Sequence, residues 1–503
     1  MVMFERQPSI QPSSFSMTNC LQQGVIASTN PNRVTWGSGT INSPGSPPGN
    51  ASVGGFPYID NNETPGCEGS NGFNCYPLEW ETTPELLEKA GVSWMLYQDG
   101  TAATAHYTDN FDDNPFAWFK QYQTAAPGTP LYEKGFVGES IQTFLDQCAN
   151  GTLPTISYII GPAELSEHPQ FTPRDGAWFQ KQIVDAVTSS PLYKSTALII
   201  SYDETGGWFD HVVPYHSPNG TVGEWLEDPY NEVGFTYTGP GYRLPFAVVS
   251  PWTRGGSVFV EHADHNSQIL FLEHWLAAKG FNITTPEMNP WRREHMSTLV
   301  NMFDFENPDY SVPELPFALE PYIDPSTDLF AGSEFCEAMF PTQTPPVPYG
   351  KQVAPDALNT LSEQGFKEMR GLLTEGRYIV FEYGGFALSN QGKPSNDFAA
   401  TRATAAHNDI HQRWIVNVLQ DNGGQVASTF TISSAFDQRY IGEHTGMSTG
   451  GSGAETYTIS YAPSQGYSLQ KENGKYLTID KHGHVQITSE QTFFMAYSVT
   501  YSK

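Results

Sequence analysis

Short apolar runs alternate with amphipathic segments over the first 300 residues of the chain. Residues 155–160, 197–200 and 246–250 are apolar runs bounded by turn residues, a pattern typical of buried strands. Residues 176–190 have helical spacing, and a second helical pattern follows Asp264. The order strand, helix, strand, strand, helix predicts an α/β domain, a sheet covered by helices.

The pattern changes after residue 339. Residues 340–350 are rich in proline without apolar periodicity, which indicates a linker. Beyond it we expect a short helix at 358–373, followed by strands at 378–383, 413–419, 429–433, 456–461, 476–479, 485–488 and 495–501. The predicted organisation is a catalytic domain at 1–339, a linker at 340–357 and an all-β domain at 358–503, either a sandwich or a trefoil-like barrel.

Two adjacent carboxylates follow the second predicted strand. Asp203 and Glu204 come directly after residues 197–200, and Gly206-Gly207 then ends the strand. Open α/β sheets place their active sites at such strand ends, and paired carboxylates can bind one hard metal ion. The simpler alternative is a solvated turn.

The other predicted elements also carry polar residues at their ends. His168 follows the first strand, and Asp264 and His265 begin the helix after the third. Thr29 lies just before a predicted helix start, with Asn30 as its cap and Pro31 in its first turn. A helix N-terminus favours a phosphate that Thr29 could attack, although the same residues also suit an ordinary turn.

Four segments together resemble a known family. They are 29–33 (Thr-Asn-Pro-Asn-Arg), 166–169 (Ser-Glu-His-Pro), 202–211 (Tyr-Asp-Glu-Thr-Gly-Gly-Trp-Phe-Asp-His) and 264–267 (Asp-His-Asn-Ser). In order and spacing over residues 4–300, the chain is similar to the phosphoesterase family of phospholipases C and related acid phosphatases, and most similar to fungal secreted non-haemolytic members. The resemblance implies an alkaline-phosphatase-like α/β fold whose central, mostly parallel sheet has helices on both faces.

The resemblance also implies roles for individual residues. Thr29 corresponds to the nucleophile, and Asp203, Glu204 and Thr29 to ligands of a divalent metal ion, calcium or zinc. His168 and His265 would contact the phosphoryl oxygens or protonate the leaving alkoxide. The substrate would be bound by Asn32, Arg33, Asp264 and His211, although a structural role in the loop is an alternative for His211.

One family motif is missing from this chain. Members begin with a strand leading into Glu-Asn-Arg-Ser-Phe-Asp-His, which supplies two metal ligands, whereas this chain starts at Met1-Val2-Met3-Phe4. We therefore expect an N-terminally truncated domain without its first strand and with fewer metal ligands. A truncation, an incorrectly assigned gene start and an alternative start remain open.

The net charge of the chain bears on its binding partners. A net charge of -29, with only 25 Lys and Arg in 503 residues, disfavours nucleic acid and anionic membranes as partners.

No signal peptide or transmembrane stretch is visible, so secretion is inferred from the relatives and from sequons at Asn50, Asn62, Asn150, Asn219 and Asn282. Cys67 and Cys75 could form a disulfide, which leaves Cys20, Cys148 and Cys336 with an odd thiol.

Two classes of function remain open at this point. The first is a metal-dependent hydrolase that cleaves a phospholipid or a phosphomonoester. Trp178, Trp208 and Trp252 could line a choline site by cation–π contact, although core packing is the commoner role of such residues. The second is a catalytically inactive, truncated member that acts as a binding module. A tightly held metal ion would distinguish the enzyme from the inactive form.

Overall fold

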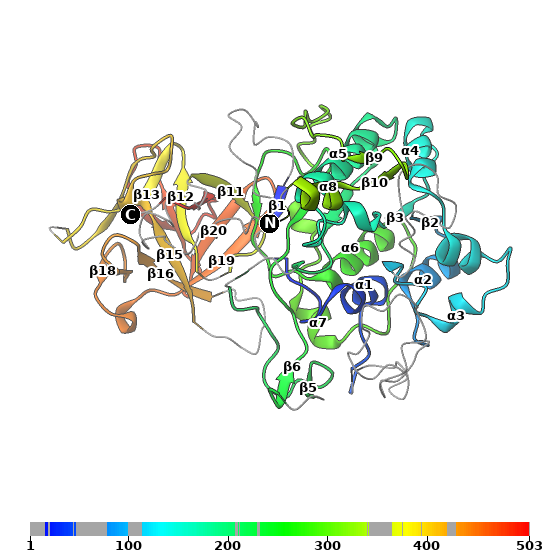
Figure 1. Ribbon diagram of the computed structural model, residues 1–503. Helices are drawn as coiled ribbons and strands as arrows, with labels where there is room; N and C mark the ends of the chain where they lie inside the picture. The colour runs from blue at the N-terminus through cyan, green and yellow to red at the C-terminus, as the bar shows by residue number, and fades with distance from the viewer. Residues whose placement is uncertain are drawn as a thin grey trace.

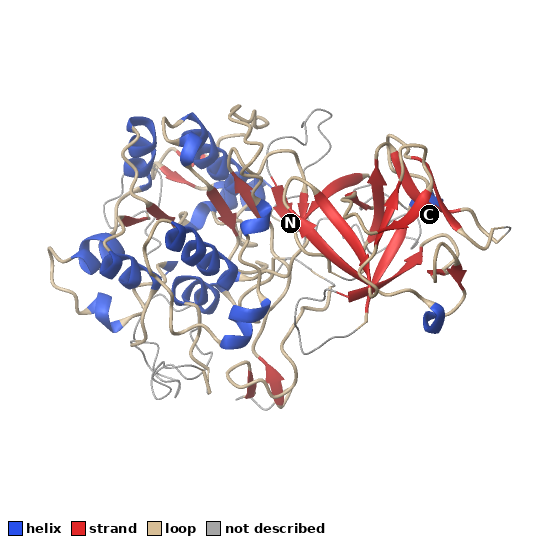
Figure 2. Ribbon diagram, turned by 180° about the vertical axis from the view of Figure 1, so that it is seen from behind, coloured by secondary structure: helices blue, strands red, loops and turns tan. Residues whose placement is uncertain are grey.

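The computed structural model describes residues 21–43, 45–46, 78–98, 113–206, 210, 212–228, 232–339, 341, 365–374, 376–393, 395–419 and 429–501, together with the backbone of 16–18. Helices gather in the N-terminal part, and strands make up most of the C-terminal part beside it (Figures 1 and 2). Residues 340 and 342–364 are outside this description, so the predicted linker and its boundaries stay predictions.

The N-terminal part contains the longer helices. Their bounds are α1 (Thr29–Ser38), α2 (Thr83–Ala90), α3 (Lys120–Gln123), α4 (Ile141–Asn150), α5 (Pro173–Ser189), α6 (His265–Ala278), α7 (Pro290–His295) and α8 (Gly332–Met339). Local sequence explains where several of them begin. The Thr172 side chain accepts a hydrogen bond from the Asp175 N–H, and Pro173 occupies the first position of α5. The helices predicted near 176–190 and after Asp264 are confirmed as α5 and α6.

The predicted central, mostly parallel sheet is not confirmed. The strands predicted at 197–200 and 246–250 form β4 (Leu198–Ser201) and β7 (Phe246–Val249), which pair antiparallel. Antiparallel neighbours need no helical crossover, and no helix lies in the described residues between these two strands. β1 (Ser16–Thr18) pairs antiparallel with β7 and parallel with β8 (Val258–Phe259).

Three further strand pairs lie in this part of the chain. The strand predicted at 155–160 forms β3 (Ile156–Ile159), which pairs in parallel with β2 (Trp94–Tyr97). The two other pairs, both antiparallel, are β5 (Trp225–Glu227) with β6 (Phe235–Tyr237) and β9 (Ile323–Asp324) with β10 (Leu329–Phe330). The mixed pairing places the ends of β3 and β4 in separate hydrogen-bonded sheets.

The C-terminal part is a closed, antiparallel arrangement of strands. They are β12 (Tyr378–Tyr383), β13 (Phe386–Asn390), β14 (Phe398–Arg402), β15 (Trp414–Val418), β16 (Thr429–Ser434), β17 (Tyr440–Ile441), β18 (Met447–Ser448), β19 (Tyr457–Ala462), β20 (Gly466–Lys471), β21 (Tyr476–Ile479), β22 (Val485–Thr488) and β23 (Met495–Val499). Each strand predicted from the sequence is present. The described residues from 365 onward therefore consist mainly of strands, as predicted, and the closed barrel they form also includes β1, β4, β7 and β8. This arrangement favours the barrel over the sandwich, whereas the domain boundaries stay predictions.

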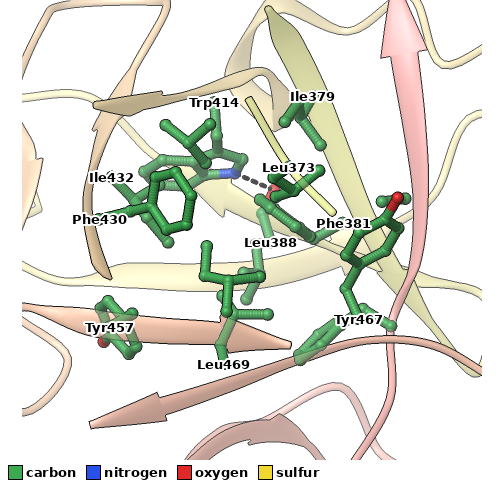
Figure 3. Packing of buried hydrophobic residues seen from close by; sticks show 14 of the residues in the cluster. Leu373, Ile379, Phe381, Leu388, Trp414, Phe430, Ile432, Tyr457, Tyr467 and Leu469 are labelled. Carbon is green, nitrogen blue, oxygen red and sulfur yellow. Dashed lines mark hydrogen bonds between the residues drawn. The ribbon is translucent and has the colours of Figure 1, made fainter. Parts of the chain in front are cut away.

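A dense apolar core fills this barrel. Trp414, Phe430 and Leu469 are buried in its centre (Figure 3), and the Trp414 indole N–H donates a hydrogen bond to the Leu388 carbonyl oxygen at 2.9 Å. Buried side chains come from most strands, and β12 and β16 each carry at least three consecutive buried residues. Val258 and Val260 of the N-terminal part belong to the same cluster, so the core continues across the junction of the two parts.

The helix predicted at 358–373 is wrong where the structure describes it. Residues 366–370 form the strand β11 (Phe366–Arg370), which pairs antiparallel with β23 and parallel with β8. Both edges of β11 therefore find partners distant in sequence, and such tertiary pairing overrides local helical spacing. Through β11, the sheet of the N-terminal part and the barrel form one hydrogen-bonded unit.

Candidate active site

Thr29 is the first residue of α1 and is buried. Ser28, rather than the predicted Asn30, occupies the N-cap position, because it is the last residue with extended backbone angles before the helix; its side chain makes no capping hydrogen bond. The positive end of the helix dipole gives the surroundings of Thr29 a partial positive charge. The position suits a hydroxyl that reacts with a phosphate group.

Asn32 holds the loop before Thr29 in place. Its side-chain amide donates to the carbonyl oxygens of Ala27 and Ser28, and its oxygen accepts from the Val25 N–H, each at 3.0 Å. Asn32 is fully buried. This geometry fits a positioning role better than the substrate contact predicted from the sequence.

Arg33 joins α1 to the carboxylates after β4. Its Nε donates to Asp203 Oδ2 at 2.7 Å, and its Nη1 donates to the Asp113 carbonyl oxygen at 3.0 Å. Thr29 and Arg33 are four residues apart and therefore lie on the same face of α1. Arg33 thus connects α1, the helix that begins with the predicted nucleophile, to the predicted metal ligand Asp203.

The two carboxylates after β4 differ electrostatically. Burial acts to raise the pKa of Asp203, but the Arg33 charge and hydrogen bonds from Arg33 and the Glu204 N–H leave that pKa below its usual value. Burial, and then the Asp203 charge, raise the pKa of Glu204. Asp203 is therefore the more firmly ionised of the pair.

His265 lies at the first position of α6 and is buried. The Gly24 N–H donates to its Nδ1 at 3.4 Å, and its Nε2 lies 3.1 Å from the Tyr202 carbonyl oxygen. A neutral ring with its proton on Nε2 satisfies both contacts. Burial lowers the pKa of His265, in keeping with that neutral form. His265 therefore connects the Thr29 loop to the strand end that carries Asp203.

Asp264 belongs to a buried ionic network. It caps α6, and its Oδ2 accepts from Arg292 Nη1 at 2.5 Å. Arg292 also donates to the Gly24 carbonyl oxygen and, through Nε and Nη2, to Glu224. The side chains of Asp264, Arg292 and Glu224 are almost completely buried. Asp264 thus holds the backbone around the site, and the predicted substrate contact has no support in this geometry.

His168 and Glu167 contribute differently to the site. His168 is exposed, and the Ser166 Oγ accepts a hydrogen bond from its backbone N–H at 3.2 Å. Glu167 is buried in a left-handed backbone conformation with φ of 66°. A Cβ atom at Gly176 of α5 would lie 2.1 Å from Glu167 Cγ, so only glycine fits there.

Two arginines that sequence reasoning missed help to form the site. Arg292 is one of them. Arg243 donates to Asp210 from its backbone N–H, Nε and Nη2, at 3.0, 3.1 and 2.7 Å. These bonds fix Asp210 near the end of the 202–211 segment. Residues 207–209, which include Trp208, and His211 lie outside the described residues. Its position just before the strand predicted at 246–250 is the feature of the sequence that could have identified Arg243 as a site residue.

The predicted metal site stays a prediction. Asp203 and Glu204 are ligands of the type that calcium and zinc accept. Among the residues that the structure describes, no group of three or more His, Cys, Asp or Glu side chains is placed to hold an ion. The predicted disulfide between Cys67 and Cys75 lies outside the described residues, as does Cys20, while Cys148 and Cys336 are free thiols.

Trp178 and Trp252, two of the three tryptophans considered for a choline site, pack against other aromatic rings. The Trp178 ring lies 5.5 Å from that of Phe330, and the Trp252 ring lies 5.8 Å from that of Phe305. These contacts are typical of side chains that stabilise the fold. A role in choline binding stays a prediction.

Acid is expected to destabilise the fold through His262, which stacks on Tyr215 at 4.2 Å. Burial, and then the Arg377 charge, lower the pKa of His262 from 6.5 to about 4. Between pH 6.5 and pH 4 the unfolded chain therefore binds more protons than the folded chain. The contribution of His262 to the free energy of unfolding is complete above pH 6.5 and falls by on the order of 2 kcal/mol as the pH is lowered to 4. Urea unfolding across this range measures the loss.

The matched variants are His262→Gln and His274→Gln, since His274 is exposed on α6. We expect the first substitution to flatten the pH dependence and the second to leave it unchanged. An equally steep dependence in His262→Gln would contradict the assignment.

Comparison with known proteins places the site in a family. Residues 12–277 match the model of the phosphoesterase family, and residues 427–500 match that of the fascin domain. The chain is 37% identical to a non-hemolytic phospholipase C of Burkholderia pseudomallei, with 60% of this chain and 44% of that protein covered. It is 34% identical to a non-hemolytic phospholipase C of Pseudomonas aeruginosa, with 60% and 43% covered.

A third relative is the phospholipase C B of Mycobacterium tuberculosis, at 32% identity with 56% of this chain and 52% of that protein covered. The chain thus spans about half the length of the curated relatives it matches. The particular similarity to fungal members stays a prediction. Because the first family match covers more than half of the 503 residues, the chain belongs to the phosphoesterase family.

Proposed function

We propose that this protein is a phospholipase C, which hydrolyses a phospholipid such as phosphatidylcholine to diacylglycerol and phosphocholine. The observation that supports it most directly is the arrangement of α1. Thr29 lies at the helix start, and Arg33, on the same face, binds Asp203 at 2.7 Å. A hydroxyl, a helix N-terminus and a guanidinium group are thereby available to one phosphate group.

In the proposed reaction, Thr29 Oγ gives its proton to solvent water and attacks phosphorus, and the bond from phosphorus to the diacylglycerol oxygen breaks. His168, which is exposed, donates a proton to the leaving oxygen and takes one back from solvent. Water then hydrolyses the phosphothreonine, releases phosphocholine and restores the hydroxyl. His265, with both ring nitrogens near backbone groups, acts in this scheme by positioning the Thr29 loop.

A divalent metal ion is part of the proposal, with Asp203, Glu204 and Thr29 as its ligands from the described residues. Such an ion would lower the pKa of a bound hydroxyl and stabilise charge on phosphoryl oxygens. The pairing of Asp203 with Arg33 keeps that carboxylate ionised, as a ligand must be.

Secretion is the proposed location. The sequons at Asn150, Asn219 and Asn282 all lie on the exposed surface, where a glycan could be attached. Asn50 and Asn62 are outside the described residues. Among the helices that the structure describes, none has the length and apolar character of a membrane-spanning segment.

The first test compares hydrolysis of a chromogenic phosphocholine diester with that of a chromogenic phosphomonoester, together with the metal content of the purified protein. We expect faster diester turnover and a bound divalent ion. Asp203→Asn should lower both metal content and rate, the rate by about 100-fold or more. The exposed Asp146→Asn on α4 is the control and should change neither.

Each other outcome has a defined meaning. Preferential turnover of the monoester would make the protein an acid phosphatase-type enzyme. Absence of turnover of both esters would favour the inactive binding module. An Asp203→Asn variant with unchanged metal content and rate would contradict the metal assignment.

A further inference from the structure

The β5–β6 hairpin projects from the helix-rich part of the molecule, as both views show (Figures 1 and 2). Its strands pair antiparallel, with Trp225 opposite Tyr237 and Glu227 opposite Phe235. Asp228 Oδ2 accepts from the N–H groups of Glu232 and Val233. Backbone pairing and this carboxylate thus fix the strand ends.

Aromatic stacking supports the hairpin from within. The Trp225 ring stacks on Phe235 at 5.6 Å, and His216 stacks on Tyr237 at 4.3 Å. The Trp225 indole N–H donates to Ser217 Oγ at 2.9 Å. Such a cluster gives an exposed hairpin a fixed shape.

Large apolar side chains nevertheless face solvent here. Val222 is 72% exposed, Val233 71% and Phe235 48%, and we call these three residues the hairpin patch. Val233 and Phe235 lie on the hairpin, and Val222 lies three residues before β5. Exposed apolar residues on and next to a projecting element indicate a surface that meets an apolar partner. The hairpin patch is a candidate for such a surface.

Hydrogen bonds connect the hairpin to the Thr29 loop. The Ile26 N–H donates to the Thr238 carbonyl oxygen at 2.8 Å, and the Gly241 N–H donates to the Gln23 carbonyl oxygen at 2.9 Å. Ile26 and Tyr242 are each 43% exposed. Exposed apolar side chains therefore occur both on the hairpin and beside the backbone that joins it to the Thr29 loop.

The charge of this region restricts the partner. Residues 212–240 contain no Lys or Arg, whereas Glu227 and Glu232 are exposed carboxylates. An anionic membrane would be repelled by them and by the net charge of -29. A phosphatidylcholine surface presents trimethylammonium groups outward, and carboxylates beside aromatic rings attract such groups.

We propose that the hairpin patch docks the protein on a zwitterionic phosphatidylcholine surface and brings the Thr29 loop to the lipid headgroups. This inference rests on the proposed phospholipase C function. Val233 and Phe235 enter the headgroup region, while Glu227 and Glu232 contact choline. Association is driven by apolar burial, so it depends little on salt and weakens when an anionic lipid is added.

The test is cosedimentation of the full chain with vesicles of dioleoylphosphatidylcholine, alone and mixed with an equal amount of dioleoylphosphatidylserine. We expect Val233→Ser/Phe235→Ser to lower vesicle binding about tenfold. The control, Val312→Ser/Phe317→Ser, removes two side chains that are 59% and 82% exposed elsewhere and should bind as the unchanged chain does. Neither double variant should alter turnover of the soluble phosphocholine ester.

The outcomes separate this inference from the proposed function. Unchanged vesicle binding in Val233→Ser/Phe235→Ser, equal loss in both double variants, or tighter binding to the phosphatidylserine mixture would overturn the docking surface. A change in Val233→Ser/Phe235→Ser that is confined to the oligomeric state, measured by light scattering, would overturn it as well. Specific vesicle binding without turnover of either soluble ester would overturn the proposed function and retain the docking surface.

Discussion

Thr29→Ala is expected to lower hydrolysis of the phosphocholine ester by at least about 1,000-fold while leaving the fold intact. Thr29 is the first residue of α1, so alanine there removes a hydroxyl without changing the N-cap residue Ser28. The proposed reaction forms a bond from that hydroxyl to phosphorus, and no other step supplies a substitute. Initial rates and circular dichroism of the purified variant measure both parts of the prediction.

Two companion variants make this result specific. Thr29→Ser keeps a hydroxyl at the helix start and should retain substantial activity. Ser28→Ala removes the neighbouring exposed hydroxyl and should be nearly as active as the unchanged chain. Retained turnover in Thr29→Ala would remove Thr29 from the mechanism, and a loss confined to Ser28→Ala would reassign the nucleophile.

Arg292→Met is expected to destabilise the protein by about 3 to 5 kcal/mol. Methionine approximates the length of the arginine stem but leaves the Glu224 and Asp264 carboxylates buried without their cation. Burial already raises the pKa of Glu224, and Arg292 acts against that rise. Without the Arg292 cation, the folded state contains two buried and unpaired carboxylates, which raises its free energy relative to the unfolded state. Urea unfolding at neutral pH measures the change.

Arg293→Met is the matched control for this prediction. Arg293 follows directly in sequence and also binds a carboxylate, that of Glu273, but its side chain is 31% exposed. Its loss should cost less, because it leaves one carboxylate rather than two without a cation, and Glu273 still accepts a hydrogen bond from the Thr285 N–H at 2.9 Å. Equal free energies of unfolding for Arg292→Met and the unchanged chain would show that the buried network does not stabilise the fold.

Much of the local structure could be predicted from periodicity and turn residues. The runs at 198–201 and 246–249 became strands because short, continuous apolar segments bury well on both faces of a sheet. The C-terminal strands were found for the same reason, with glycine turns between them. Pairing direction was not predictable, since nothing in the run at 198–201 says that it meets 246–249 antiparallel.

The site was only partly predictable. Thr29, Asp203 and His265 were singled out from their positions at element ends, and the structure links their segments through Arg33 and backbone hydrogen bonds. Asn32 and Asp264 looked equally suited to substrate, because a motif shows which residues occur but not which atoms they contact. In the structure both side chains make buried hydrogen bonds within the protein, and their substrate-binding roles stay predictions.

The sequence by itself determined the family, the element types at most positions and the residues that carry the candidate chemistry. These features depend on neighbours in the chain: apolar spacing, capping residues and short motifs. The tertiary structure decided that residues 366–370 form a strand, that Arg292 joins Gly24 to Asp264 and Glu224, and that Arg33 binds Asp203. Each of these contacts joins residues more than a hundred positions apart or requires burial that local spacing does not encode, so only the folded chain brings the partners together.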